Sequence, residues 1–391
     1  MSRPVFVSQV STDPFVPAWL DQKELEHVIA QDVPEFQKIE SISSRSEQSA
    51  LRVLVQAKLR SNVLRTLNYL VKSPAASKAD ELIVPFEKNF KVEFLMHDKI
   101  LPALEELYKD VGKNIVFTPH RSSLQSRNCL YLEYLQSKGY RLASQPNGLA
   151  QPAMEIVLSK LAAYHAATAR YLEANPAQIR ELPKLEENPK SSNDRVKKLK
   201  SLLQTKFHES LRSNNVREYE DKVKSYQNSL NENNETLDVK TSFNVILNGS
   251  CWPNNLLYNG DAFGHIKEIL FIDFHYSKYG PAVYDLLNLL LTAPAEKSRY
   301  FDANVKYYHD QLIDNLKALK FRGKLPTLTE LQLDLLKFGH WAFEVSTEIL
   351  PIVLSEFHTN DIDELFKGSK FSQEIQELLP WLENRGYFEE D

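Results

Sequence analysis

Residues 248–285 read NGSCWPNNLLYNGDAFGHIKEILFIDFHYSKYGPAVYD, and the order of features within them is informative. A strand leads into a loop that ends at Asn255, a hairpin follows, and a second strand ends at Asp273. This layout is typical of a phosphotransferase, in which a catalytic loop supplies a base and an amide ligand and a later strand supplies an aspartate for Mg²⁺. Amide and carboxylate oxygens suit this ion when phosphates complete its coordination. The stretch therefore predicts a phosphoryl-transfer site with Asn255 and Asp273 as metal ligands.

The same stretch resembles the insect ecdysteroid-kinase-like proteins, the CHK-like group, which are related to choline kinases and aminoglycoside phosphotransferases. These proteins carry a catalytic loop HGDxWxNN, a DFQ-type metal motif and a DL pair. The corresponding segments here are residues 248–255 (NGSCWPNN), 273–275 (DFH) and 285–286 (DL). The resemblance implies an α+β, bilobal protein-kinase-like fold with a β-rich N-lobe and a mainly helical C-lobe. It also implies ATP-dependent phosphorylation of a small-molecule hydroxyl, with ATP and Mg²⁺ as cofactors.

Other segments match this family in the same order along the chain. Lys72 in YLVK matches the lysine-bearing strand and would contact the α- and β-phosphates, and Glu93 on the next helix would pair with Lys72. Residues 131–135, YLEYL, match the hinge, where backbone groups of Glu133 and Leu135 would receive adenine. Further matching segments are PAWL at 17–20, GYRLA at 139–143 and LAAYHAAT at 161–168. The resemblance thus covers nearly the whole chain.

The chain departs from the family pattern at three places that affect chemistry. Ser250 stands where the family has its catalytic aspartate, and a serine hydroxyl has no basic form near neutral pH. Asn248 replaces the preceding histidine, and the phosphate-covering loop aligns with residues 43–51, SSRSEQSAL, which contain no glycine. Asp261 cannot serve as a displaced base, because the residue five positions later is Ile266 rather than an asparagine. These changes predict a very slow kinase or a pseudokinase that still binds nucleotide.

Three functional hypotheses stay open on these residues. The first is a divergent, weak phosphotransferase, since phosphoryl transfer depends mostly on positioning and a general base contributes only about 10²–10⁴-fold. The second is a non-catalytic module that binds nucleotide, a small ligand or a protein partner. The third is a helical scaffold that is not a kinase. For two polar residues we favour structural roles: Asp285 anchors the catalytic loop by hydrogen bonds, and His165 is a packing residue with satisfied ring nitrogens.

The composition excludes several other classes. The chain has 391 residues but 11 glycines, and the first is Gly112, so a glycine-rich phosphate loop is excluded before that residue. The net charge of −5 argues against nucleic-acid binding. Cys129 and Cys251 form no CxxC pair, which excludes a disulfide scaffold and a cysteine-type zinc site. With no apolar run near 18 residues, we expect a cytoplasmic protein without a membrane partner.

Periodicity predicts two domains, an N-lobe at residues 1–135 and a C-lobe at 136–391 with a polar helical insertion at about 174–240. The N-lobe is expected to contain a helix at 17–30 capped by Asp21, strands at 50–58, 64–72, 114–118 and 129–135, and a helix at 84–109 bent by Pro102. The C-lobe is expected to contain helices at 152–173, 193–212, 215–230 and 282–293, and a hairpin turn at Asn259-Gly260.

Overall fold

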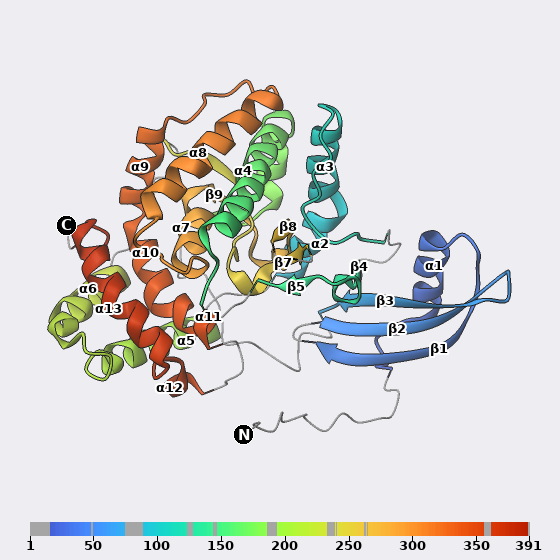
Figure 1. Ribbon diagram of the computed structural model, residues 1–391, viewed down its shortest axis with the longest axis horizontal. Coiled ribbons are helices and arrows are strands. Elements are labelled where there is room, and N and C mark those ends of the chain that lie inside the picture. The colour runs from blue at the N-terminus through green and yellow to red at the C-terminus, as the bar shows by residue number, and fades with distance from the viewer. Residues whose placement is uncertain are drawn as a thin grey trace. The chain divides into compact units, whose positions relative to one another are not determined.

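A computed structural model of the chain describes residues 16–47, 50–74, 89–122, 128–143, 147–185, 194–232, 239, 241–261, 263, 265–355 and 361–389 (Figure 1). Two compact units divide the chain: Met1–Glu81 with His120–Lys138, and Leu82–Pro119 with Gly139–Asp391. The segment Leu82–Pro119, which the sequence prediction placed in the N-lobe, therefore groups with the larger unit. Its apolar residues explain this, because Val92, Met96 and Leu104 belong to the large helical core.

The first unit is an antiparallel sheet covered by one helix. Its strand order is β1-β2-β3-β4, and alternate residues of β2, among them Val53 and Val55, are fully buried. Helix α1 packs Leu25, Val28 and Ile29 into the same core. The period-two pattern of β2 puts its apolar side chains on one face of the sheet, and α1 covers that face. The elements are α1 (Gln22–Asp32), β1 (Phe36–Glu47), β2 (Ala50–Leu59), β3 (Leu64–Lys72) and β4 (Leu130–Glu133).

The structure confirms several predicted elements of this unit and corrects others. The Asp21 side chain accepts a hydrogen bond from Lys23 N and caps α1, and β2 and β3 coincide with the predicted strands. Strand β1 was missed, because FQKIESISSRSE lacks an apolar alternation. It carries residues 43–47 of the expected phosphate-covering loop, while residues 48 and 49 lie outside the described residues.

The prediction of a strand at residues 114–118 is wrong. These residues form an irregular segment of the second unit, in which Phe117 N donates to Glu105 Oε1 and Phe117 O accepts from Phe271 N. The buried phenyl ring accounts for the strand-like pattern. A short apolar run therefore marked an anchored loop rather than a strand.

The second unit is a helical bundle with two small sheets. Helix α4 lies along α8, and every residue of α7 is buried (Figure 1). The sheets have the orders β5-β7-β8 and β6-β9. The strands are β5 (Arg141–Leu142), β6 (Asn244–Leu247), β7 (Leu256–Gly260), β8 (Ile266–Phe271) and β9 (Lys278–Pro281). The helices are α2 (Phe90–Leu95), α3 (Leu101–Lys109), α4 (Gln151–Ala174), α5 (Asp194–Ser210), α6 (Glu220–Glu232), α7 (Val283–Thr292), α8 (Phe301–Ala318), α9 (Leu328–Lys337), α10 (Gly339–Glu344), α11 (Leu350–Leu354), α12 (Ile362–Leu365) and α13 (Ser369–Asn384).

Proline and turn chemistry act largely as predicted. A π-helical turn, Met96–Ile100, separates α2 from α3, and Pro102 lies in the first turn of α3. Proline has no backbone N–H to donate within a helix, so it is tolerated in the first turn but not in the interior. The predicted break of the helix near Pro102 is therefore confirmed. The predicted hairpin is also confirmed, but Asn259 and Gly260 pair with β8 and the turn comes after them, where Asp261 N donates to His265 O. The Asp261 carboxylate accepts from two backbone N–H groups of that turn.

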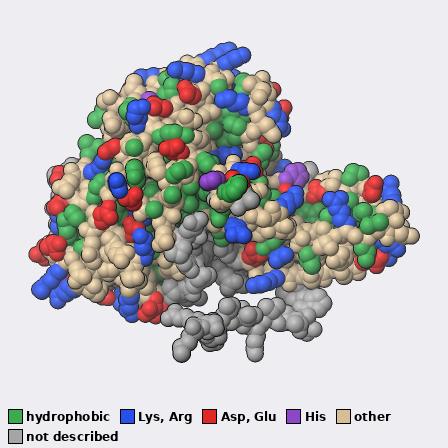
Figure 2. Space-filling model, in the orientation of Figure 1, with side chains coloured by type: hydrophobic (Ala, Val, Ile, Leu, Met, Phe, Trp, Pro, Cys, Tyr) green, Lys and Arg blue, Asp and Glu red, His purple; other side chains and the backbone are tan. Residues whose placement is uncertain are grey.

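The polar insertion is helical and joins the core on one side. Leu203 and Phe207 of α5 and Val223 of α6 are fully buried, and the Phe207 ring contacts those of Phe343 and Phe366. Acidic and basic side chains are intermixed on the face shown in Figure 2. No helix among the described residues is long and apolar enough to cross a membrane.

A buried carboxylate lies where α5 meets a second π-helical turn, Val345–Ile349. Gln204 Nε2 donates to Glu348 Oε1 at 2.9 Å, and the neighbouring Glu344 pairs with Lys200 at 2.9 Å. Burial raises the pKa of Glu348 from 4.5 to about 8, against an opposing effect of Lys200. Near neutral pH this group is therefore protonated in the folded chain.

This shift predicts a loss of stability between pH 5 and pH 8. The unfolded state releases the Glu348 proton near pH 4.5 while the folded state retains it up to about pH 8, so the free energy of unfolding falls as pH rises through that window. Glu348→Gln is expected to lose less stability than the wild type between these two pH values in urea unfolding. Glu106→Gln, at an exposed position on α3, should behave like the wild type. Equal losses in all three proteins would contradict the prediction.

Candidate functional site

Two chain segments that were predicted to share the site lie side by side. The loop 248–255 follows β6, the metal-motif segment 273–277 follows β8, and β6 pairs with β9 just beyond that segment. Ile272 N donates to Asn255 O at 3.0 Å. The structure therefore brings the backbones that carry Asn255 and Asp273 together, although the residues between them form a complete hairpin.

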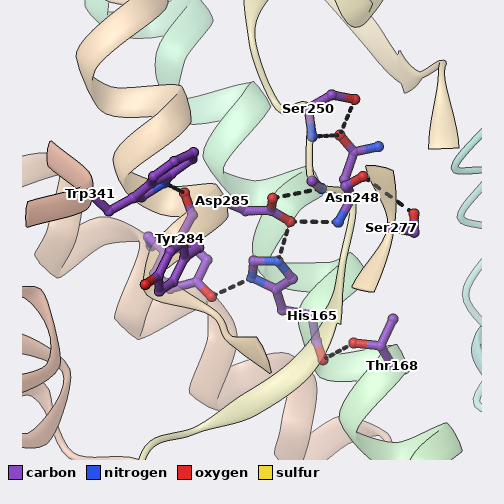
Figure 3. Close-up of polar contacts among 10 residues, drawn as sticks. His165, Thr168, Asn248, Ser250, Ser277, Tyr284, Asp285 and Trp341 are labelled. Atoms are coloured by element: carbon purple, nitrogen blue, oxygen red, sulfur yellow. Dashed lines mark hydrogen bonds and ion pairs between the residues drawn. The ribbon is translucent and has the colours of Figure 1, made fainter. Parts of the chain in front are cut away.

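Asp285 ties the catalytic loop to helix α7. Its fully buried carboxylate lies in the first turn of α7, where the helix dipole favours a negative charge. Oδ2 accepts from Asn248 N at 2.7 Å and Oδ1 accepts from Gly249 N at 2.9 Å (Figure 3). The predicted anchoring role of Asp285 is confirmed, since one side chain fixes two consecutive backbone groups of the loop.

His165 holds the other side of this carboxylate. Its Nε2 lies 3.1 Å from Asp285 Oδ2, and its Nδ1 lies 2.6 Å from the hydroxyl of Tyr308. Burial raises the pKa of Tyr308 far above its usual value, so this hydroxyl keeps its proton and is a hydrogen-bond partner for Nδ1 as either donor or acceptor. On the other side of the ring, the Nε2–H donates to the Asp285 carboxylate. His165 is therefore a satisfied packing residue, as predicted.

Gly249 is required by the close approach of the two segments. Its φ is +80°, and a Cβ atom at this position would lie 2.1 Å from Tyr276 O. An L-residue would be strained in this conformation and would also push the metal-motif segment away. The glycine of the catalytic loop is thus needed for packing, whether or not the site transfers phosphate.

Ser250, at the position of the expected base, acts as a hydrogen-bond donor. The buried hydroxyl donates to Asp273 O at 2.8 Å and lies 3.3 Å from Asn248 Oδ1, which also accepts from Ser250 N. Asn255 Nδ2 donates to Ser250 O at 3.2 Å. The hydroxyl proton of Ser250 is used to brace the catalytic loop against the metal motif, and an aspartate could not make the same bond.

Asp273 has an unusual backbone conformation. Its φ of 62° and ψ of 72° are in the left-handed region, which costs an L-residue about 1–2 kcal/mol and is best tolerated by Asp and Asn. The bond from Ser250 and the pairing of β8 hold the residue there. Strain of this kind gathers at functional sites. The oxygen donors of Asp273 and Asn255 fit Mg²⁺, which prefers such ligands.

Glu93 lies near the metal motif and contacts its third residue. Glu93 of α2 is fully buried, and its Oε2 lies 2.8 Å from Nε2 of His275, which is 7% exposed. Asn89 N, just before α2, donates to His275 O. The contact between Glu93 and His275 was not foreseen, because the resemblance paired Glu93 with Lys72 and gave His275 no role.

The other expected nucleotide ligands lie in the first unit. Lys72 is the last residue of β3, is 4% exposed and pairs with Leu130 of β4. Glu133 ends β4, and its N–H donates to His120 O at 2.9 Å. Leu135 begins a 3₁₀ turn. The binding roles of Lys72, Glu133 and Leu135, and the pairing of Lys72 with Glu93, stay predictions.

Tyr308 and Ser277 also support the loop and were missed. Tyr308 completes the bonding of His165, and Ser277 Oγ donates to Asn248 O at 3.3 Å. Neither residue stands in a recognisable motif. For Ser277, proximity to the metal motif was the available signal, whereas Tyr308 had none.

Comparison with known proteins adds the following similarities. The sequence profile of the ecdysteroid kinase-like family matches residues 49–321. A comparison with curated proteins finds no match. Among solved structures, an ethanolamine kinase from Plasmodium vivax has 12% identity over 92% of this chain and 89% of its own, with a TM-score of 0.37. A spectinomycin phosphotransferase in complex with ADP and spectinomycin has 11% identity over 90% of this chain and 98% of its own, with a TM-score of 0.40. A GDP complex of an aminoglycoside 2′-phosphotransferase has 15% identity over 86% of this chain and 98% of its own, with a TM-score of 0.38.

Proposed function

Because the chain belongs to the ecdysteroid kinase-like family, we propose that it binds ATP and transfers phosphate to a small-molecule hydroxyl slowly, without a general base. The hydrogen bond from the Ser250 hydroxyl to Asp273 O carries this proposal. A serine hydroxyl has no basic form near neutral pH, and the proton of this hydroxyl is already engaged by a backbone carbonyl, so Ser250 cannot take the proton of a substrate hydroxyl. The loop that holds it is otherwise well ordered by Asp285, so the site has a defined shape but lacks a base.

The reaction tolerates the loss of a base better than most. The acceptor oxygen forms a bond to the γ-phosphorus, the bond from phosphorus to the bridging oxygen breaks, and ADP leaves. The transition state is loose, so the O–H bond of the acceptor stays largely intact until late in the reaction. The proton then passes to solvent. Positioning and charge stabilisation supply most of the rate enhancement, and the missing base accounts for about 10²–10⁴-fold.

The remaining residues take the roles that the family pattern implies. Asn255 and Asp273 would hold Mg²⁺, which when bound would neutralise charge on the phosphates. Lys72 would contact the α- and β-phosphates, Glu93 would orient Lys72, and backbone groups of Glu133 and Leu135 would bind adenine. The expected acceptor is a hydroxylated small molecule, with ecdysteroids as the first class to test.

Nucleotide binding can be tested by thermal unfolding. Mg-ATP at about 100 times its Kd is expected to stabilise the chain by about 2.7 kcal/mol. Asp273→Ala should reduce this shift, because it removes a proposed metal ligand. Asp261→Ala, which changes an aspartate on the β7–β8 turn, should retain it. Absence of any shift with Mg-ATP in the wild type would contradict the proposal.

A non-catalytic binding protein is the second candidate. The contact between Glu93 and His275 favours it, because a carboxylate that faces this imidazole is less available to orient a phosphate-binding lysine. In this case Mg-ATP would bind, but no phosphorylated product would form from a panel of ecdysteroids and other hydroxylated compounds. Long incubations with radiolabelled ATP distinguish a slow enzyme from an inactive one.

A further inference from the structure

Glu93, Asp273 and His275 form a compact group of metal-ligating side chains. A carboxylate oxygen from each acid and a ring nitrogen of His275 all lie within 4.8 Å of one another. Among the described residues, no other group of three His, Cys, Asp or Glu residues has such spacing. Glu93 comes from α2, while Asp273 and His275 lie on either side of Phe274 at the end of β8. Two separate elements therefore converge on one point.

His275 supplies the observation that points to a bound cation. Its ring is more than nine-tenths buried, and neither ring nitrogen makes a hydrogen bond with a described residue. Nε2 faces Glu93 Oε2 at 2.8 Å without hydrogen-bond alignment. In the same unit, His165 has both nitrogens bonded, as buried histidines normally do. A ring nitrogen of His275 thus lies close to the carboxylates of Glu93 and Asp273 and can still bind a metal ion.

The distances suit a single ion. Zinc binds imidazole nitrogen and carboxylate oxygen at about 2.0–2.2 Å, so two of its ligand atoms lie roughly 3 Å apart. The contact between Glu93 and His275 already has nearly this length. The third ligand atom, within 4.8 Å, requires only a small side-chain movement, and partly exposed Asp273 leaves a path for the ion.

The kind of donor decides the kind of metal. Mg²⁺ takes oxygen ligands in a strict octahedral geometry and rarely accepts imidazole. One imidazole with two carboxylates suits a divalent transition metal such as Zn²⁺. We propose that Glu93, Asp273 and His275 form a site for a divalent transition-metal ion, for which Zn²⁺ is the probe. The site shares Asp273 with the proposed Mg²⁺ ligands but includes no phosphate oxygen, so it does not rest on nucleotide binding.

The test is calorimetric titration of the full chain with ZnCl₂ in the absence of nucleotide. We expect one Zn²⁺ per chain, with affinity at least tenfold weaker in His275→Gln and in Glu93→Gln. His265→Gln is the matched control. His265 also lies beside a carboxylate, that of Asp261, but these two residues are not part of any described group of three metal-ligating side chains. Its affinity should equal that of the wild type. Co²⁺ offers a second readout, as a visible absorption band that His275→Gln removes.

The variants are chosen so that misfolding cannot be mistaken for lost ligation. His275→Gln introduces the residue of the DFQ-type motif at this position, so it should fold, as circular dichroism and metal-free thermal unfolding would verify. Asp273→Asn provides a second variant of nearly equal size. Equal Zn²⁺ affinity in the wild type and His275→Gln would overturn the proposal, and so would the absence of stoichiometric binding in the wild type.

Discussion

Replacing both Asn248 and Ser250 by the residues of the family pattern is expected to raise the rate of phosphoryl transfer by about 10²–10⁴-fold. In Asn248→His/Ser250→Asp, the new carboxylate would accept the proton of the acceptor hydroxyl as that oxygen attacks the γ-phosphorus. The measurement is the initial rate of product formation with Mg-ATP and the best acceptor from the ecdysteroid panel. The gain should appear in kcat, because a base acts on the transition state rather than on substrate binding.

The two substitutions belong together for a structural reason. Asp273 O and Asn248 Oδ1 both accept hydrogen bonds around the Ser250 side chain, so Ser250→Asp alone places a carboxylate against two acceptors. The single variant should therefore be less stable and gain less activity than the double variant. Ser250→Asn, which has the size of aspartate without its basicity, serves as the control and should show no gain. A double variant that binds Mg-ATP but shows no faster turnover would refute the slow-enzyme hypothesis.

Asp285→Asn is expected to lower the free energy of unfolding by about 3–5 kcal/mol. The buried carboxylate accepts from Asn248 N, Gly249 N and His165 Nε2, and an amide group must turn its NH₂ toward at least one of these donors. Leaving a buried donor without an acceptor costs about 1–3 kcal/mol, and more when a charge is lost with it. Urea unfolding of the full chain, monitored by far-UV circular dichroism, measures the change.

A surface aspartate provides the comparison for Asp285. Asp310 on α8 has half of its side chain exposed and pairs with Lys306, so Asp310→Asn should cost less than about 1 kcal/mol. If Asp285→Asn also costs less than 1 kcal/mol, its three hydrogen bonds do not anchor the catalytic loop. A large loss of stability with unchanged Mg-ATP binding in the folded fraction would support a structural role.

Local pattern predicted regular elements well where it was strong. The apolar alternation of ALRVLVQAKL is compatible only with a strand, and the capping residue Asp21 indicates the start of a helix. The structure contains both, as β2 and α1. The pattern failed where tertiary pairing decided the outcome. Strand β1 is mostly polar, its apolar residues Phe36, Ile39 and Ile42 do not alternate, and it is paired along β2. Residues 114–118 look like a strand, but Phe117 is instead held by Glu105 and Phe271.

The amino-acid sequence by itself determined the family, the order of the segments 248–255 and 273–275, and the presence of Ser250 where the family pattern has an aspartate. These features are short segments with characteristic residues and spacing, so they can be identified before folding is considered. The scarcity of glycine also excluded a glycine-rich loop before Gly112.

Only the tertiary structure decided what the residues of these segments do. Ser250 donates to Asp273 O, Gly249 leaves no room for a Cβ beside Tyr276, and His275 faces Glu93. Each of these contacts joins segments that lie far apart along the chain. Their distances and directions depend on how β6, β8 and α2 pack, and no local pattern specifies that packing.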